Sequence, residues 1–263
     1  RDRLSDTLQI NANAFIGHYL YDGIYVYSGT PPVLNNDESH GDWWGGELRF
    51  LNTALARHKL VFGAEYRNNT HQDQSNYDAS PDYFSYLDDK RNGSMSGIYA
   101  QDEYALSDQW TINAGARYDH IVQGTHDNVI NPRLAVIYKP QAATSYKLLY
   151  GTAFRTPNVL ERYYGTVAGG YKQNPDLAPE KIKTVEAVLE RYVSNDVRVT
   201  GSVFWYQTKD LINLTQDPVD GLLLYRNIDQ ADARGVELEA ERRWASGQRL
   251  RVSYTWQLVE NTA

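Results

Sequence analysis

Apolar and polar residues alternate along short segments throughout this 263-residue chain. In the clearest segment, from Trp110 to Tyr118, every second residue is apolar or aromatic. A period of two places those side chains on one face of an extended strand and the polar ones on the other. No apolar run approaches the roughly 18 residues that a membrane-spanning helix needs. The sequence therefore predicts an all-β protein.

About eleven segments show this alternation, and no convincing helix lies between them. The predicted strands begin near Leu8, Glu47, Leu60, Gly97, Trp110, Arg133, Tyr146, Glu186, Val197, Tyr225 and Leu250. Short and long connections alternate between the predicted strands. Tight turns are expected near Arg57, Asp108, Gln141, Asn195 and Gly247. Longer loops are expected over residues 23–42, 68–91, 124–131 and 157–179.

Short turns on one rim and long loops on the other are typical of an antiparallel transmembrane β-barrel. The mean hydropathy of −0.60 does not oppose this, because only every second residue of such a strand faces lipid. Trp110 and Tyr118 share one face and lie far enough apart to mark both membrane interfaces, and Tyr146 and Phe154 repeat the spacing. Ala114 is then expected near the bilayer midplane, toward lipid.

Two residues near this strand refine the expected facing. Asn113 should point into the lumen, since successive side chains point to opposite faces. Asp102 falls on the lipid face, so either it lies at headgroup level or a β-bulge shifts the register there.

Residues 146–241 also carry five short motifs in a fixed order. They are Gly-x-x-Phe-Arg-x-Pro from Gly151, Asn-Pro-x-Leu-x-Pro-Glu from Asn174, Asp-Leu-Ile from Asp210, Asn-Ile from Asn227 and Arg-Gly-Val-Glu from Arg234. Each motif alone is weak, but their order resembles the C-terminal half of the barrel in TonB-dependent outer-membrane receptors.

The resemblance implies a receptor in the bacterial outer membrane that takes up a scarce nutrient with energy delivered by TonB. Ferric siderophores, haem and cobalamin are the ligands of that family. Its barrels have twenty-two strands around an N-terminal plug, so residues 1–263 are expected to form part of one barrel domain without the plug and the final strands. The implied partners are the nutrient, the plug, TonB through the plug, and outer-membrane lipid.

Two other functions stay open at this point. One is a smaller outer-membrane barrel, either a porin or a barrel enzyme, and the other is a soluble β-sandwich that binds carbohydrate. No catalytic or cofactor motif is present, so neither an enzyme nor a cofactor is expected. The net charge of −7 argues against a nucleic-acid partner. The six histidines fall singly along the chain, which predicts no metal site.

Charged residues on the predicted lumen face alternate in sign between neighbouring strands. The arginines are Arg67, Arg117, Arg155, Arg198 and Arg251, and the glutamates are Glu47, Glu186, Glu190, Glu237, Glu239 and Glu241. Antiparallel neighbours would thus offer cross-strand Arg–carboxylate pairs. These charges either form a wall against which a plug packs or solvate a water-filled lumen.

The long loops are the expected ligand surface, because aromatic side chains on loops can clamp a planar ligand. The candidate contacts are Tyr163, Tyr164 and Tyr171 in the 157–179 loop and Tyr83 and Tyr86 in the 68–91 loop. The second loop also carries five aspartates that are candidates for Ca²⁺ binding, although their spacing is not that of an EF-hand. They are Asp73, Asp78, Asp82, Asp88 and Asp89.

Overall fold

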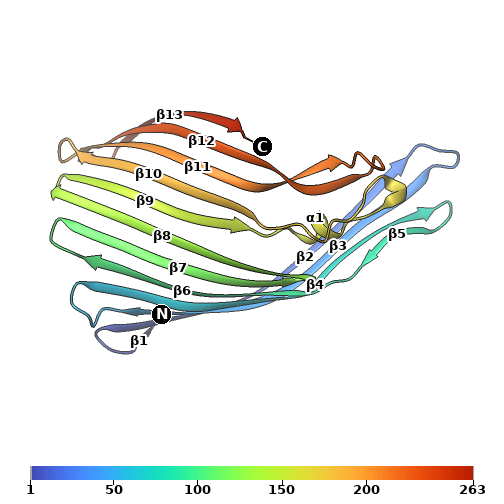
Figure 1. The fold of residues 1–263 in the computed structure, drawn as a ribbon, viewed down its shortest axis with the longest axis horizontal. Helices are drawn as coiled ribbons and strands as arrows, with labels where there is room; N and C mark the ends of the chain where they lie inside the picture. Colours follow the sequence, from blue (N-terminus) through green and yellow to red (C-terminus); the bar gives the residue numbers. More distant parts are fainter. Residues whose placement is uncertain (1, 263) are drawn as a thin grey trace.

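A computed structural model, which describes residues 2–262, folds into one antiparallel sheet that follows the order of the chain (Figure 1). The strands are β1 Asp2–Arg3, β2 Leu8–Tyr27, β3 Val33–Asn52, β4 His58–Ser80, β5 Phe84–Asp89, β6 Gly93–Ala105, β7 Trp110–Gln123, β8 Thr125–Gln141, β9 Thr144–Arg155, β10 Glu180–Tyr192, β11 Val197–Gln216, β12 Leu223–Arg243 and β13 Arg249–Asn261. Two short helices, α1 Val159–Tyr163 and η1 Val167–Gly169, lie between β9 and β10. No helix among the described residues is long and apolar enough to cross a membrane.

The predicted architecture is confirmed. Eleven long strands pair in sequence, β5 pairs beside β4, and all ladders between strands are antiparallel. The five tight turns gather along one rim, on the left of Figure 1, and are called the short-turn rim below. A β-sandwich needs two sheets packed face to face, so the single sheet of residues 2–262 excludes that alternative. Within this range β1 and β13 do not pair with each other, and the sheet stays open.

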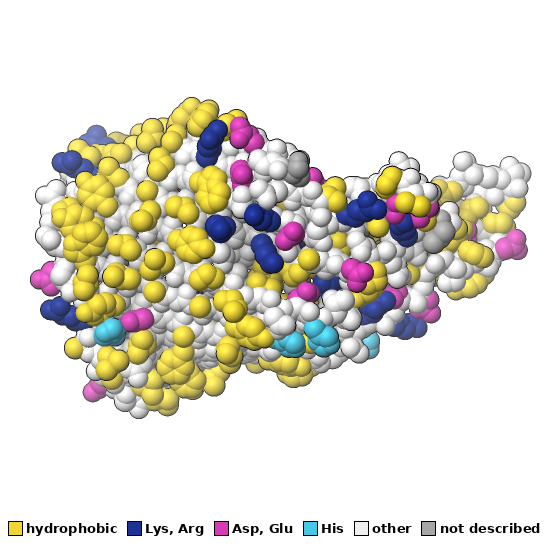
Figure 2. Space-filling view, viewed as in Figure 1, with side chains coloured by type: hydrophobic (Ala, Val, Ile, Leu, Met, Phe, Trp, Pro, Cys, Tyr) yellow, Lys and Arg dark blue, Asp and Glu magenta, His cyan; other side chains and the backbone are white. Residues whose placement is uncertain are grey.

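The sheet has one apolar face, which we call the outer face, and one polar inner face. Large hydrophobic side chains on the outer face are exposed, for example Leu148 at 55%. In Figure 2 they spread over the short-turn half of the molecule. Ala114 and its cross-strand neighbour Leu134 belong to this face, and Asn113 to the other, as predicted. Lipid would cover such a surface at little cost.

Aromatic side chains border the outer apolar surface at both ends. Near the short-turn rim, the ring centroids of Trp110 and Tyr138 lie 4.4 Å apart and those of Tyr138 and Tyr146 lie 6.2 Å apart. At the opposite border the rings of Trp44 and Tyr66 lie 5.6 Å apart. Amphipathic rings in two bands are what the two water–lipid interfaces favour.

Asp102 lies on the outer face, and the register around it is continuous. Neither the β4–β6 nor the β6–β7 ladder has a shift, so the β-bulge alternative is wrong. The Oδ2 atom of Asp102 lies 2.6 Å from Nδ1 of His58, and that imidazole stacks on Tyr104 at 4.4 Å. Asp102 lies three residues before the end of β6 and directly opposite Ala114, and its placement at headgroup level stays a prediction.

Three of the predicted loops are instead strands. Residues 23–42 lie largely in β2 and β3, which pair without interruption from Leu8↔Asn52 to Tyr27↔Val33. Residues 68–91 lie mostly in β4 and β5, and residues 125–131 begin β8 after a tight turn at Gly124. Residues 35–42 and 68–76 are polar on both faces and residues 24–27 are apolar or aromatic on both, so alternation of hydropathy does not mark these segments. Residues 17–43 and 68–89, called the extension below, project to the right past the end of β6, whose ladder with β4 stops at Asn69↔Gly93 (Figure 1).

Candidate ligand-binding site

A pocket of about 460 Å³ lies between the inner face of the extension and the 157–179 loop. The extension supplies Tyr27, Val33, Asn35, Asn76, Asp78 and Tyr86, and the loop supplies Tyr164, Thr166, Ala168, Gly169 and Tyr171. Strands provide one wall and a loop the other, so most of the site is held by backbone ladders. Phenols, amides and a carboxylate are its polar groups.

Tyr164 joins the loop wall of the pocket to the strand wall. Its hydroxyl accepts a hydrogen bond from Nδ2 of Asn76 at 3.3 Å and bonds to the Asp37 carboxylate. Burial, with the charge of Asp37 as a second cause, raises the pKa of Tyr164 to about 12. Burial likewise raises the pKa of Asp37. At neutral pH Tyr164 is therefore a protonated phenol and its ring meets Tyr171 edge-on at 6.0 Å.

The strand wall of the pocket is a closed network of polar side chains. Nδ2 of Asn35 donates to the carboxylate of Asp78 at 2.9 Å, and Asn35 and Asn76 exchange amide hydrogen bonds of 3.1 and 3.2 Å. The hydroxyl of Tyr86 donates to the other oxygen of Asp78 at 2.6 Å, which raises the pKa of Tyr86. Each group is held in one orientation by its neighbours, so this wall is preorganised.

The loop wall is anchored by Arg162, whose side chain is only 1% exposed. Its Nη1 atom donates to the carbonyl of Gln123 and to Oγ1 of Thr125, at 3.2 and 2.7 Å. Its Nη2 atom donates to Oδ2 of Asp127 at 2.8 Å and to the carbonyl of Leu177 at 2.7 Å. One planar guanidinium thus ties both ends of the loop to the β7–β8 turn.

Tyr163 and Lys172 add two further anchors. The buried hydroxyl of Tyr163 donates to the Gln123 carbonyl at 2.8 Å, and the guanidinium carbon of Arg91 lies 3.3 Å from its ring centroid. Lys172 forms ion pairs with Asp217 and Asp220 beyond β11. The ammonium of Lys172 lowers the pKa of Asp217 to about 2, so this pair stays ionised at any physiological pH.

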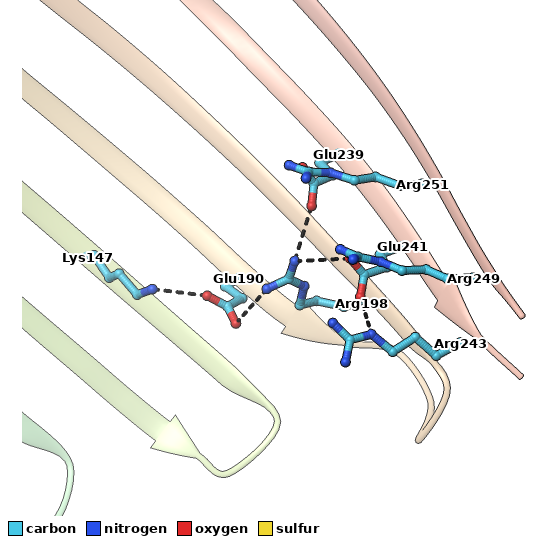
Figure 3. Close-up of polar contacts among 8 residues, drawn as sticks. All are labelled: Lys147, Glu190, Arg198, Glu239, Glu241, Arg243, Arg249 and Arg251. Atoms are coloured by element: carbon cyan, nitrogen blue, oxygen red, sulfur yellow. Dashed lines mark hydrogen bonds and ion pairs between the residues drawn. The ribbon is translucent and has the colours of Figure 1, made fainter. Parts of the chain in front are cut away.

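A second cluster of charged side chains lies on the inner face near the short-turn rim (Figure 3). Arg198 on β11 lies at its centre, 3.8 Å from Glu190, 3.1 Å from Glu239 and 3.6 Å from Glu241. Lys147 extends the network from β9, with Nζ 3.0 Å from Glu190. Three arginines complete it on the other side: Arg243, Arg249 and Arg251. Five neighbouring strands therefore share one polar network.

The TonB dependent receptor-like β-barrel family matches residues 1–263 of this chain. The chain belongs to that family. Its members are outer-membrane receptors and transporters of bacteria, which sets aside the porin and barrel-enzyme alternatives. It also accounts for an apolar outer face between two aromatic borders.

Three curated relatives illustrate the match. The chain is similar to the ferrioxamine B receptor of Salmonella typhimurium, 27% identical over 236 residues, covering 78% of this chain and 31% of the relative. The iron-regulated outer membrane virulence protein of Vibrio cholerae is 27% identical over 219 residues, covering 77% and 32%. The heme/hemopexin utilization protein C of Haemophilus influenzae is 23% identical over 218 residues, covering 71% and 31%. The chain thus spans about a third of the length of these relatives.

Solved structures share the fold. The copper transporter OprC superposes with a TM-score of 0.78 at 15% identity, over 98% of this chain and 45% of that one. The ferric yersiniabactin uptake receptor FyuA from Yersinia pestis gives a TM-score of 0.74 at 21% identity, over 98% and 41%. At such identities the likeness extends to the TonB-dependent receptor fold alone.

The five tyrosines that were predicted to contact the nutrient fall into three groups by their position in the receptor. Tyr86, Tyr164 and Tyr171 line the pocket. Tyr163 lies outside it, buried to 2% exposure against the β7–β8 turn, where it positions the loop. Tyr83 is 71% exposed in the β4–β5 turn. Ligand contact by any of them stays a prediction.

The six predicted lumen residues share the inner face of the receptor sheet. Arg198 and Glu239 pair in the network of Figure 3. Arg117 contacts Glu65 at 2.9 Å and Asp119 at 2.7 Å. Arg155 binds Glu161 and Glu180 at the base of the 157–179 loop, at 2.9 and 2.7 Å. Glu186 and Glu237 lie opposite Phe204 and Ser202 in the ladders, on that same face.

Sequence reasoning about metal ligands needs one correction. Within residues 2–262, the aspartates proposed for Ca²⁺ do not gather into a cluster; Asp88 and Asp89, for example, pair with Lys90 and Arg91. The histidines, in contrast, do not all stay apart: His18 and His40 meet at Asp42. Because those three residues lie on two strands of one hairpin, only the cross-strand register could have revealed them.

Gly124 offers a test of how Tyr163 anchors the loop. Its φ angle is +73°, and a Cβ atom there would lie 2.0 Å from the Tyr163 hydroxyl oxygen. We expect Gly124→Ala to loosen the loop, which limited proteolysis within residues 157–179 would detect. Gly247→Ala is the matched control, because its φ is +88° but nothing lies within 4 Å of the new Cβ. Both changes cost about 1–2 kcal/mol of backbone strain, but only the first should increase cleavage in the loop.

Proposed function

We propose that residues 1–263 form part of one barrel domain of a receptor that takes up an iron chelate, either a ferric siderophore or haem. TonB supplies the energy, acting through an N-terminal plug. The pocket of phenols, amides and a carboxylate between the extension and the 157–179 loop is the observation that carries this proposal. The names of the cited Salmonella and Haemophilus relatives, a ferrioxamine B receptor and a heme/hemopexin utilization protein, support the ligand class.

The charge of the pocket further restricts the class of chelate that it can bind. Asp78 lines it, Asp37 lies beside it, and no lysine or arginine is among the described residues of its lining. Carboxylates and hydroxyls accept hydrogen bonds from amide and ammonium groups, and they repel a polyanion. A neutral or cationic chelate, such as a ferric trihydroxamate, therefore suits the site better than a polyanionic ferric tris-catecholate.

The inner-face network suits a plug as its partner. Arg198 and its carboxylates lie near the short-turn rim, on the side of the sheet away from lipid. A plug surface with complementary charges could exchange ion pairs with this wall at small net cost, because each cation of the wall already lies beside a carboxylate. The alternative role, solvating an open lumen, would leave the network unaffected by removal of the plug.

The proposal is tested by measuring equilibrium binding of a ferric trihydroxamate and of a ferric tris-catecholate to the full-length receptor. We expect the ferric trihydroxamate to bind at least tenfold more tightly than the tris-catecholate. Replacing Tyr164 and Tyr171 by alanine should weaken binding of the preferred chelate about tenfold per ring, since each lost contact is worth roughly 1.4 kcal/mol. Tyr83→Ala is the control, because that ring lies outside the pocket. Unchanged affinity in the double variant would contradict the proposed site.

A further inference from the structure

Three histidines and two aspartates meet on the outer face of the extension, away from the ligand pocket. They are His18 on β2, His40 and Asp42 on β3, and His71 and Asp73 on β4. Asp42 precedes Trp44 by two residues in β3, on the side of the extension. The cluster therefore shares the face of the aromatic border and lies just outside it. Nothing in the uptake proposal uses these side chains.

All three imidazoles converge on one carboxylate. Nδ1 of His18 lies 2.7 Å from Oδ1 of Asp42, while Nε2 of His40 and Nδ1 of His71 lie 2.8 and 3.2 Å from Oδ2. The ring centroids of His18 and His40 are 5.4 Å apart, and those of His40 and His71 are 5.3 Å apart. The side chains of His18 and His71 are 60% and 53% exposed, so the cluster is open to solvent.

An irregularity in the β3–β4 ladder builds the cluster. Trp43 pairs with Asn69, but the next pair joins Asp42 to His71, so Thr70 is an extra residue in β4. Without this bulge, Thr70 would lie opposite Asp42 and His71 would point to the inner face. Bulges re-aim side chains in this way, and they are common beside functional sites. The hydroxyl of Thr70 donates to the Asp42 carbonyl at 3.1 Å, which secures the distortion.

We propose that His18, His40, Asp42 and His71 form a binding site for a divalent transition-metal ion of the zinc class. Three imidazole nitrogens and one carboxylate oxygen are a ligand set that Zn²⁺ accepts in tetrahedral geometry. Two ligand atoms on such an ion lie about 3.3 Å apart, given bonds of about 2.0–2.1 Å. The nitrogen–oxygen distances of 2.7, 2.8 and 3.2 Å are close to that value. The ligand atoms of His18, His40 and Asp42 already lie within 4.8 Å of one another, and the exposed imidazole of His71 has to move closer to complete the set.

Asp73 supports the same assignment from the second layer of the site. Its Oδ2 atom lies 3.9 Å from Nδ1 of His40, the ring nitrogen that does not face Asp42. That distance is longer than a hydrogen bond, so the carboxylate acts on the imidazole through its charge alone, which raises the basicity of the ring. The ion would cross-link β2, β3 and β4 just above the membrane border. The proposal does not depend on which nutrient the receptor takes up.

The test is zinc binding to full-length receptor, purified in detergent through a tag without histidine and freed of metal. Bound zinc is counted after equilibrium dialysis, and Co²⁺ absorption reports tetrahedral coordination. We expect the double variant His18→Ala/His71→Ala to lose one equivalent of zinc and the matching Co²⁺ band. Asp42→Asn should weaken the site more than tenfold.

His126→Asn is the matched control. His126 stacks on His120 with centroids 5.9 Å apart, on β8 and β7, and the neighbouring hydrogen-bond acceptor is the amide of Asn128 rather than a carboxylate. It should leave both the zinc count and the Co²⁺ band unchanged. The proposal is overturned if the double variant binds as much zinc as the native receptor, or if His126→Asn loses the same equivalent.

Discussion

Leu134→Arg should lower the free energy of unfolding of the membrane-embedded receptor by about 2–4 kcal/mol. Leu134 is exposed on the outer face, midway along its strand between Tyr138 and Ile130. Its cross-strand neighbours, Ala114 and Tyr150, offer an arginine no carboxylate. A charged side chain at that depth must either lie in hydrocarbon or bend toward the headgroups. Reversible unfolding by urea in lipid vesicles would measure the difference.

The control for this change is Ala135→Arg, one residue further along β8 and on the inner face. Arg133 already occupies that face, so a second arginine there should cost about 1 kcal/mol or less. Ala114 is the less suitable site for the outward change, since Asp102 lies directly opposite and could neutralise the new charge. Equal costs for Leu134→Arg and Ala135→Arg would mean that the outer face does not contact lipid.

Arg162→Met should release the 157–179 loop from the β7–β8 turn. The change removes four hydrogen bonds and leaves the partly buried carboxylate of Asp127 without its cation. Breaking a buried ion pair from one side costs about 3–5 kcal/mol, and Asp127 is 19% exposed, so we expect about 3 kcal/mol. A cost of about 3 kcal/mol raises the population of molecules with an open loop roughly a hundredfold. Hydrogen exchange of the amides in α1 would measure it.

Affinity for the chelate should fall along with the protection of the loop, because the loop carries Tyr164 and Tyr171. Arg243→Met is the control: its side chain is 68% exposed and contacts Glu241, which keeps Arg249 as a partner. It should change neither exchange in α1 nor affinity. Slow exchange in the Arg162 variant would show that other contacts, such as Tyr163 and Lys172, are sufficient.

The membrane-facing part of the sheet could be predicted from the sequence because lipid constrains which side chains can face it. Every second side chain of a spanning strand must be apolar, and Trp110 to Tyr118 satisfies this residue by residue. The extension is under no such demand. Asn35 faces the pocket and Asn36 faces outward, yet both are amides, so composition cannot separate strand from loop.

The candidate sites were predictable to different degrees for a related reason. Aromatic density within one loop pointed to Tyr164 and Tyr171, since both lie close together in the sequence. Arg162 was missed because three of its four partners lie 35 to 39 residues away, at the β7–β8 turn. The histidine cluster depends on cross-strand register and on one extra residue, Thr70, neither of which a local pattern contains.

The uninterrupted β2–β3 ladder limits how this gene can change. From Leu8↔Asn52 to Tyr27↔Val33 the two strands pair without a single bulge, over about 65 Å. Losing one codon in the middle of β2 would exchange the two faces from there to the tip, turning the pocket-facing Tyr27 outward and Val26 inward. Removing or adding residues in matched pairs at the tip, residues 28–32, would leave every facing intact. Functional length variants of this hairpin are therefore expected to differ at its tip and by an even number of residues. The 157–179 loop, in contrast, can gain or lose any number of residues.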